Sequence, residues 1–308
     1  MDTIAAEAQE ILFCTYAILA GNSILMYDHV ATLPEEIAFI WRRPKALSGM
    51  LFLFNRYLAL LANISSLVVA YAPLSDERFV SSWFLNITQQ RYSCMRYTLF
   101  RQLSLIFQAI VVCLIMTIRT YALYGGSKRL LACLTIIMSA LAIAVSVGSF
   151  GQFLGNAVLL PGIGCYETYA AATAARLGLA WLAEMVFELL IFILIVYRIC
   201  KTKGLRLSLV TRGNIIDIIF HDGAMYFGAM ALINTPNIIT YYSGSVAVRG
   251  SLSTLTSCLS VTLMSRLMLN LHKSIDTGIL SITTHDEGPS LAVLTTGINV
   301  QSAISSHP

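Results

Sequence analysis

The feature that most constrains this chain is the recurrence of apolar runs of about 20 residues, the length a helix needs to cross a bilayer. Only 12% of the residues are charged, against roughly 25% in soluble domains, and the mean hydropathy is +0.74. We therefore expect an all-α integral membrane protein, a seven-helix bundle over residues 1–271, followed by a disordered cytoplasmic tail over 272–308. The seven predicted spans lie near Ala8 to Tyr27, Ala46 to Tyr71, Tyr97 to Tyr121, Leu130 to Phe153, Ala172 to Tyr197, Ile215 to Tyr242 and Leu252 to Leu271.

The basic residues between the spans predict which side each end faces. Thirteen of the twenty Lys and Arg fall on one side: Arg42, Arg43, Lys45, Arg119, Lys128, Arg129, Arg198, Lys201, Lys203, Arg206, Arg212, Arg266 and Lys273. Four fall on the other side, and three lie within spans. Because basic loops stay cytoplasmic, we expect the N-terminus outside and the C-terminus in the cytoplasm of a plasma-membrane or other secretory-pathway protein. Because the basic residues lie beside apolar runs, we expect them to contact the bilayer and do not expect the protein to bind nucleic acid.

The stretch from Tyr27 to Tyr71 joins a charged elbow to the second span. Thr32 and Glu35 have the spacing of a capping box, and Leu33, Ile37, Ile40 and Trp41 would share one face. This pattern predicts a short helix lying on the membrane surface.

Arg56 lies far from either end of the second span, with Asn55 beside it and Asn63 seven residues later on the same face. A central arginine costs about 2.5–3.5 kcal/mol on insertion scales, so it needs a partner inside the bundle. Counted from the cytoplasmic end, Glu188 of the fifth span lies at nearly the same depth, with Glu184 one turn further out. We predict that Arg56 pairs with Glu188.

Further polar residues within the spans are candidates to face a ligand: Gln108, Trp181, Asn234 and Asn237. Asn234 and Asn237 flank Pro236, which should kink or break the sixth span. The two asparagines could bind a polar ligand beside the freed carbonyls, or could satisfy one another.

Two modifications are predicted on the outer side. Cys94 and Cys165 could form a disulfide that ties the loop over 155–168 to the bundle, although two unrelated thiols remain the alternative. The sequon that begins at Asn86 could carry a glycan or stay unused. No Cys or His spacing typical of a metal site occurs, so we expect no metal and no cofactor.

The chain resembles a fungal group of multi-spanning membrane proteins, the domain-of-unknown-function 6533 family. The resemblance is carried by Tyr27-Asp28, Pro34 to Ile37, Ile40 to Pro44 and Leu51 to Tyr57, and similar patterns recur at 119–125, 222–227 and 265–271. It implies a seven-helix membrane protein and no particular activity. The chain has His221 where such proteins often have Arg or Lys, so no charge-dependent role is carried over to that position.

Three functions are compatible with these residues. A receptor would use an outer ligand site and the basic cytoplasmic residues to contact a signalling partner. A transporter or lipid-handling protein would use Arg56, Glu184 and Glu188 to line a route for a proton or polar solute. An intramembrane hydrolase is a remote third, because no HExxH motif occurs, and we expect no enzyme activity. A retinal pigment is excluded, because no Lys lies within a span.

Overall fold

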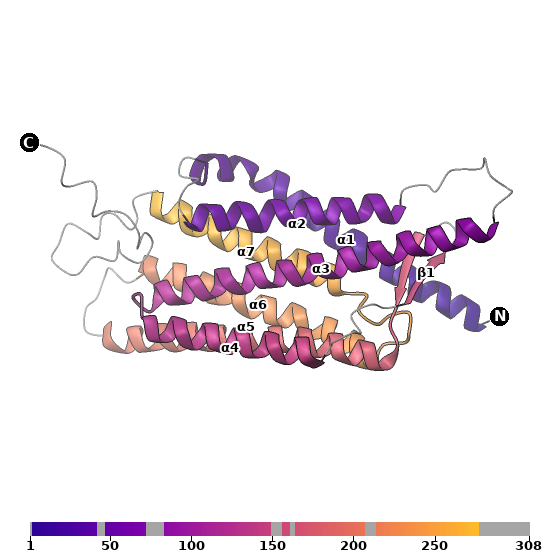
Figure 1. Ribbon diagram of the computed structural model, residues 1–308. Helices are drawn as coiled ribbons and strands as arrows, with labels where there is room; N and C mark the ends of the chain where they lie inside the picture. Colours follow the sequence, from indigo (N-terminus) through magenta and orange to yellow (C-terminus); the bar gives the residue numbers. More distant parts are fainter. Residues whose placement is uncertain are drawn as a thin grey trace, which may run out of the picture.

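The computed structural model describes residues 2–41, 47–71, 83–148, 156–160, 164–206 and 214–276. Within these ranges the chain forms seven helices and one two-stranded hairpin (Figure 1). The elements are α1 (Asp2–Phe39), α2 (Leu47–Tyr71), α3 (Trp83–Leu123), α4 (Lys128–Gly148), β1 (Asn156–Leu160), β2 (Gly164–Thr168), α5 (Ala171–Arg206), α6 (Asn214–Ser243) and α7 (Ser253–Asp276). The expectation of an all-helical membrane protein is confirmed. The last helix runs five residues past the predicted boundary at Leu271, and residues 277–308 lie outside the described part.

Four of the described helices are long and apolar enough to cross a membrane: Ala8–Phe39, Leu47–Val68, Tyr97–Leu123 and Ala171–Arg198. Helix α7 is too polar to qualify, since eight of its residues are Ser or Thr. Its position explains this composition, because α7 contacts α1, α2, α3 and α6 and its hydroxyl residues are largely buried. A helix surrounded by other helices meets little lipid and can carry polar side chains.

The helices form a ring in which each contacts the next along the chain, and contacts between α7 and α1 close it. Helix α3 crosses the interior to touch both α5 and α7. Figure 1 shows the start of α1 and the hairpin at one end of the molecule, here called the hairpin end. The end of α7 lies at the other, here called the tail end.

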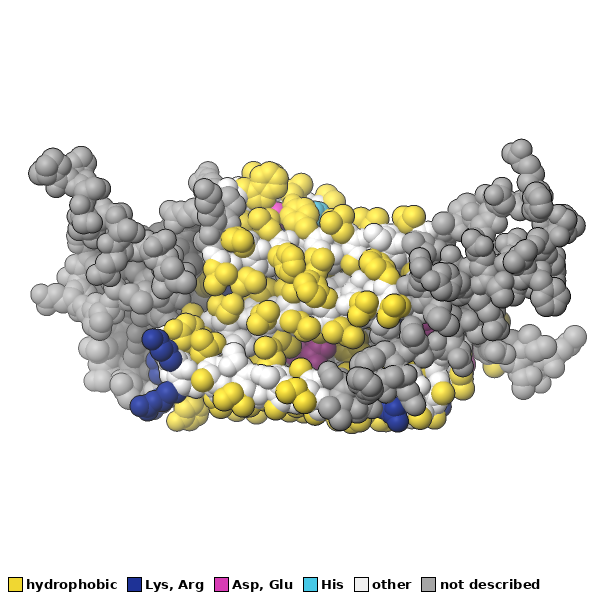
Figure 2. All heavy atoms as spheres, in the orientation of Figure 1, with side chains coloured by type: hydrophobic (Ala, Val, Ile, Leu, Met, Phe, Trp, Pro, Cys, Tyr) yellow, Lys and Arg dark blue, Asp and Glu magenta, His cyan; other side chains and the backbone are white. Residues whose placement is uncertain are grey.

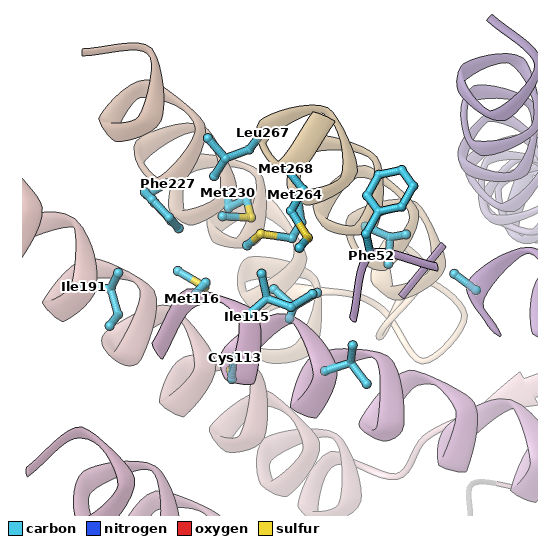
Figure 3. Close-up of a cluster of buried hydrophobic side chains, with 14 of the residues drawn as sticks. Phe52, Cys113, Ile115, Met116, Ile191, Phe227, Met230, Met264, Leu267 and Met268 are labelled. Atoms are coloured by element: carbon cyan, nitrogen blue, oxygen red, sulfur yellow. The ribbon is translucent and has the colours of Figure 1, made fainter. Parts of the chain in front are cut away.

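The apolar core lies where α2, α3, α5, α6 and α7 meet. Figure 3 shows Met116, Met230, Met264 and Met268 directed towards one another in this space, with Phe52 to one side. Unbranched methionines adapt to irregular gaps between helices. Many other large apolar side chains remain on the outside, and Figure 2 shows them across the middle of one face, with basic side chains towards the ends.

The predicted surface helix after Tyr27 is wrong, because α1 continues without interruption to Phe39 and includes Pro34. The Thr32 hydroxyl donates to the carbonyl of Asp28, one turn back, at 2.7 Å, instead of capping a new helix. Glu36 and Ile40 are buried. This segment therefore packs against its neighbours as the last turns of a 38-residue helix.

Two further local differences concern α6 and the hairpin. Helix α6 continues through Pro236, so the proline does not break it. Strands β1 and β2 pair antiparallel, with Val158 opposite Tyr166, in a segment for which no strand was predicted. The Pro161-Gly162 pair between them is a turn signal that was present in the sequence.

Helices α1 and α7 approach closely at Gly21. A Cβ atom added there would lie 2.8 Å from the Cα atom of Leu255. The position therefore requires a residue without a side chain, and this contact lets α1 pack along α7.

Candidate functional site

Arg56 is the centre of a buried charged cluster formed by α1, α2 and α7. Its Nε lies 3.0 Å from Glu36 Oε2, and its Nη1 lies 4.0 Å from Asp28 Oδ2. The guanidinium also donates to His29, through Nε to the ring Nδ1 at 3.0 Å and through Nη2 to the backbone carbonyl at 2.6 Å. Only 3% of the Arg56 side chain is exposed, so its expected burial is confirmed.

The predicted partner of Arg56 is wrong. Both acidic partners come from α1, and neither is Glu188. Counting residues from helix ends gives depth along a helix but not the direction in which a side chain points, and Glu188 projects from a different part of the ring. Asp28 and Glu36 are eight residues apart, two helical turns, so they share one face of a continuous α1. That spacing could have identified the two acids as partners from one helix. We did not use it because the first span was predicted to end at Tyr27.

Glu36 accepts hydrogen bonds from two further side chains, and Asp28 accepts one from a second arginine. Tyr57 Oη and Trp41 Nε1 donate to Glu36 Oε1 at 2.9 and 3.0 Å. On the α7 side, Arg266 Nε donates to Asp28 Oδ1 at 2.5 Å. With neutral His29, two carboxylates balance two guanidiniums. The cluster is thus charge-neutral and ties three helices together.

Asn55 and Asn63 are buried, as predicted, and both contact α7, whereas Arg56 contacts α1. Asn55 Nδ2 donates to the carbonyl of Val261 at 3.5 Å and to Ser265 Oγ at 3.4 Å. Asn63 donates to its own helix and lies against the Cys258 thiol. Both side chains are buried and serve the contact between α2 and α7.

A second polar network joins the hairpin to the helices. Arg101 of α3 donates through Nη1 to Glu167 Oε2 of β2 at 2.5 Å, and its Nη2 donates to Thr254 Oγ1 of α7 at 3.0 Å. Tyr169 donates to Glu167 and accepts from Gln102 Nε2 at 2.5 Å. Burial, reinforced by the neighbouring Glu167 carboxylate, raises the pKa of Tyr169 well above its ordinary value. The hairpin is thereby fixed to α3 and α7.

The network continues inwards from the hairpin end. Tyr241 Oη accepts from Trp181 Nε1 at 3.2 Å and lies 2.8 Å from Ser253 Oγ. Ser253 Oγ in turn donates to Asn237 Oδ1 at 3.3 Å. Of the residues predicted to face a ligand, Trp181 and Asn237 therefore belong to one chain of hydrogen bonds.

Gln108 and Trp181 also line a small cavity between α3, α5 and α7, with Glu184 of α5. Gln108 Oε1 accepts from Ser257 Oγ at 2.7 Å. Asn234 is buried, and its Nδ2 donates to the carbonyl of Trp181 at 3.5 Å. The described structure shows no hydrogen bond between the two asparagines: Asn234 donates to Trp181, and Asn237 accepts from Ser253.

Basic residues gather at the tail end. Lys128, Arg129 and Lys201 are exposed, and the Arg198 guanidinium lies over the Tyr124 ring, 5.4 Å from its centroid. Lys273 of α7 pairs with Glu35 of α1 at 2.8 Å.

Several predictions fall on residues or side chains outside the described part. These are the Cys94–Cys165 disulfide, the Asn86 glycan, and the basic side chains of Arg42, Arg43, Lys45, Lys203, Arg206 and Arg212. Within the described residues, no group of three or more His, Cys, Asp or Glu is placed to hold a metal ion.

Comparison with known proteins finds one match to a protein family. Residues 16–61 match the model of a family of unknown function, DUF6533, so the resemblance to this family is confirmed over that segment. The similar patterns at 119–125, 222–227 and 265–271 lie outside the match. The matched segment contains Asp28, His29, Glu36, Arg56 and Tyr57, which supply most of the charged cluster. A comparison with curated proteins finds no match.

Proposed function

We propose that this chain, which matches the family of unknown function DUF6533 over residues 16–61, is a receptor-like membrane protein. It senses a ligand at the hairpin end and signals through the basic tail end. All seven helices span the bilayer in this proposal, with the N-terminus outside and the C-terminus in the cytoplasm. The supporting argument for this orientation is the excess of Lys and Arg on the tail side.

The observation that carries the proposal is the position of α7. At the hairpin end, Ser253 and Thr254 of α7 belong to the network that holds the hairpin. At the other end, Arg266 of the same helix binds Asp28 in the charged cluster. A ligand that moves the hairpin would therefore act on a helix that is bonded directly to both networks. Two sites are coupled when an element that contacts both can adopt two arrangements and the ligand favours one of them. In this proposal that element is α7.

The first test concerns orientation. A tag at Met1 should be reached by antibody on intact cells, and a tag after Pro308 should be reached only after the cells are permeabilised. The opposite pattern contradicts the proposal.

The second test concerns signalling. Proteins near the tail end are identified by proximity labelling in native membranes, for the wild type and for a variant with Lys201, Lys203 and Arg206 changed to Gln. A second variant changes Lys128 and Arg129 to Gln and tests whether the basic residues at the start of α4 contribute to the same contact. Labelling of a signalling partner should be lost in the first variant. Labelling of the same partner should also change in Arg101→Gln, because that substitution loosens the hairpin. If labelling is the same in every variant, the receptor proposal fails.

A transporter is the second candidate, supported by the buried Glu188 and by Glu184, which is half-buried one turn earlier on α5. The route predicted from the sequence also included Arg56. In the structure Arg56 is paired with Glu36 of α1, so it does not line a route with the two acids. Proton or solute flux into liposomes that depends on Glu188, without a partner at the tail end, would favour the transporter.

A further inference from the structure

Glu188 is a buried acid that its surroundings do not satisfy. Its side chain is 1% exposed, and neither carboxylate oxygen has a hydrogen-bond partner. The side-chain amide of Asn234 approaches this carboxylate from α6, while Asn234 Oδ1 is buried without a partner. A single amide donor is too little to compensate an ionised Glu188.

Among the residues that the structure describes, no basic side chain acts on this carboxylate. Arg56, the cation predicted for the role, is bound by Glu36 and Asp28. The other titratable group that acts on Glu188 is Glu184, one turn earlier on the same face of α5, which adds negative charge. An ionised carboxylate buried without a partner is strongly destabilising, so the two acids either take up protons or share them with a cation from outside the chain.

A cavity beside the pair has the size and lining for a small ion. Its polar lining is Glu184, Gln108, Ser257 and Ser260, and its apolar lining is Leu105, Ala109, Val112 and Trp181. Of the two acids, Glu184 lines the cavity, and Glu188 lies one helical turn further along α5. It has room for about one water molecule. This size excludes an organic amine, while carboxylate, amide and hydroxyl oxygens are the ligands that hard cations prefer. A calcium ion would take six to eight oxygens, more than these few side chains offer.

We propose that Glu184 and Glu188, with Asn234 and the side chains lining the adjoining cavity, bind one sodium ion in the interior of the helices. The ion, together with one proton, neutralises the two carboxylates. Because α3, α5, α6 and α7 all contribute, the bound ion holds these helices together. The proposal is independent of any receptor activity.

The test measures thermal unfolding of the purified full-length protein in lipid nanodiscs at constant pH and ionic strength. Sodium chloride is compared with N-methylglucamine chloride, for the wild type and for Glu188→Gln, Asn234→Ala and the control Glu35→Gln. Glu35 lies in a half-exposed pair with Lys273 at the tail end, away from the cavity. The wild type and the control should gain about 2–4 °C when sodium reaches about five times its dissociation constant.

The variants should separate a sodium site from other causes. Glu188→Gln should lose the response to sodium and be at least as stable as the wild type without sodium, because its amide carries no charge. Asn234→Ala should need several-fold more sodium for the same shift, which tests the site even if the first variant fails to fold. A wild type that responds to pH but not to sodium, or a Glu188→Gln variant that keeps the full response, would overturn the proposal.

Discussion

Replacing Glu36 by Gln should destabilise the folded protein strongly, because it leaves the Arg56 guanidinium buried with too little negative charge. The two groups are 3.0 Å apart, and their side chains are 0% and 3% exposed. At an effective dielectric constant of about 20, the gross attraction at this distance is about 5–6 kcal/mol. Removing one partner of a buried pair costs about 3–5 kcal/mol, and Asp28, 4.0 Å from the guanidinium, offsets part of the loss.

The assay is thermal unfolding of purified full-length protein in nanodiscs, read from the fraction that remains monodisperse after heating. A loss of about 3–5 kcal/mol corresponds to a fall in Tm of about 6–20 °C. The control is Glu35→Gln, which removes the half-exposed ion pair between Glu35 and Lys273 and should cost less than about 1 kcal/mol. A Glu36→Gln variant within about 2 °C of the wild type would refute the reasoning.

Three further perturbations test other contacts. Gly21→Leu should separate α1 from α7 at Leu255 and lower the Tm by several degrees in the same assay, since a Cβ there already lies 2.8 Å from backbone. Arg101→Gln should release Glu167 and the hairpin, seen as faster amide hydrogen exchange over residues 156–168, with no change over α4 as the control region. Burial raises the pKa of Tyr124, so the folded state favours the neutral phenol. The neutral phenol's contribution to the free energy of unfolding is present below about pH 10 and is lost as pH rises through the folded-state pKa. The Tyr124→Phe variant has no phenol to ionise, so in alkaline unfolding curves it should lose less stability than the wild type above about pH 10.

Much of the helical architecture could be predicted from the sequence because bilayer length and side-chain polarity act locally. Arg56 with Asn55 and Asn63 on an inward face is an example, since a spacing of seven residues is set by helix geometry alone. All three side chains are buried in the structure.

The partner of Arg56 could not be obtained in the same way. Pairing depends on which helix lies beside α2 and on which way its side chains point, and neither is encoded in depth along the chain. The prediction also ended the first helix at Tyr27, which removed Asp28 and Glu36 from the interior. A proline at position 34 and a Thr–Glu pair favoured a helix start, and packing of Glu36 and Ile40 against other helices prevailed over these local signals.

In the candidate site, too, the polar residues within spans could be predicted from the sequence, while the contacts between distant segments could not. Gln108, Trp181, Asn234 and Asn237 were selected as polar residues within spans, and the structure places them in or beside the inner network and cavity. The hairpin network was missed, because Glu167 and Thr254 are 66 and 153 residues from Arg101 along the chain and meet it only through folding.

The most direct test of the central claim is a double-mutant cycle between Arg56→Met and Glu36→Gln, with the pair Arg56→Met and Glu188→Gln measured beside it. Partners in a buried ion pair should show a coupling energy of about 1–3 kcal/mol, while residues without contact should be additive to within about 0.5 kcal/mol. We predict strong coupling of Arg56 to Glu36 and additivity with Glu188. Strong coupling to Glu188 together with additivity at Glu36 would contradict the account.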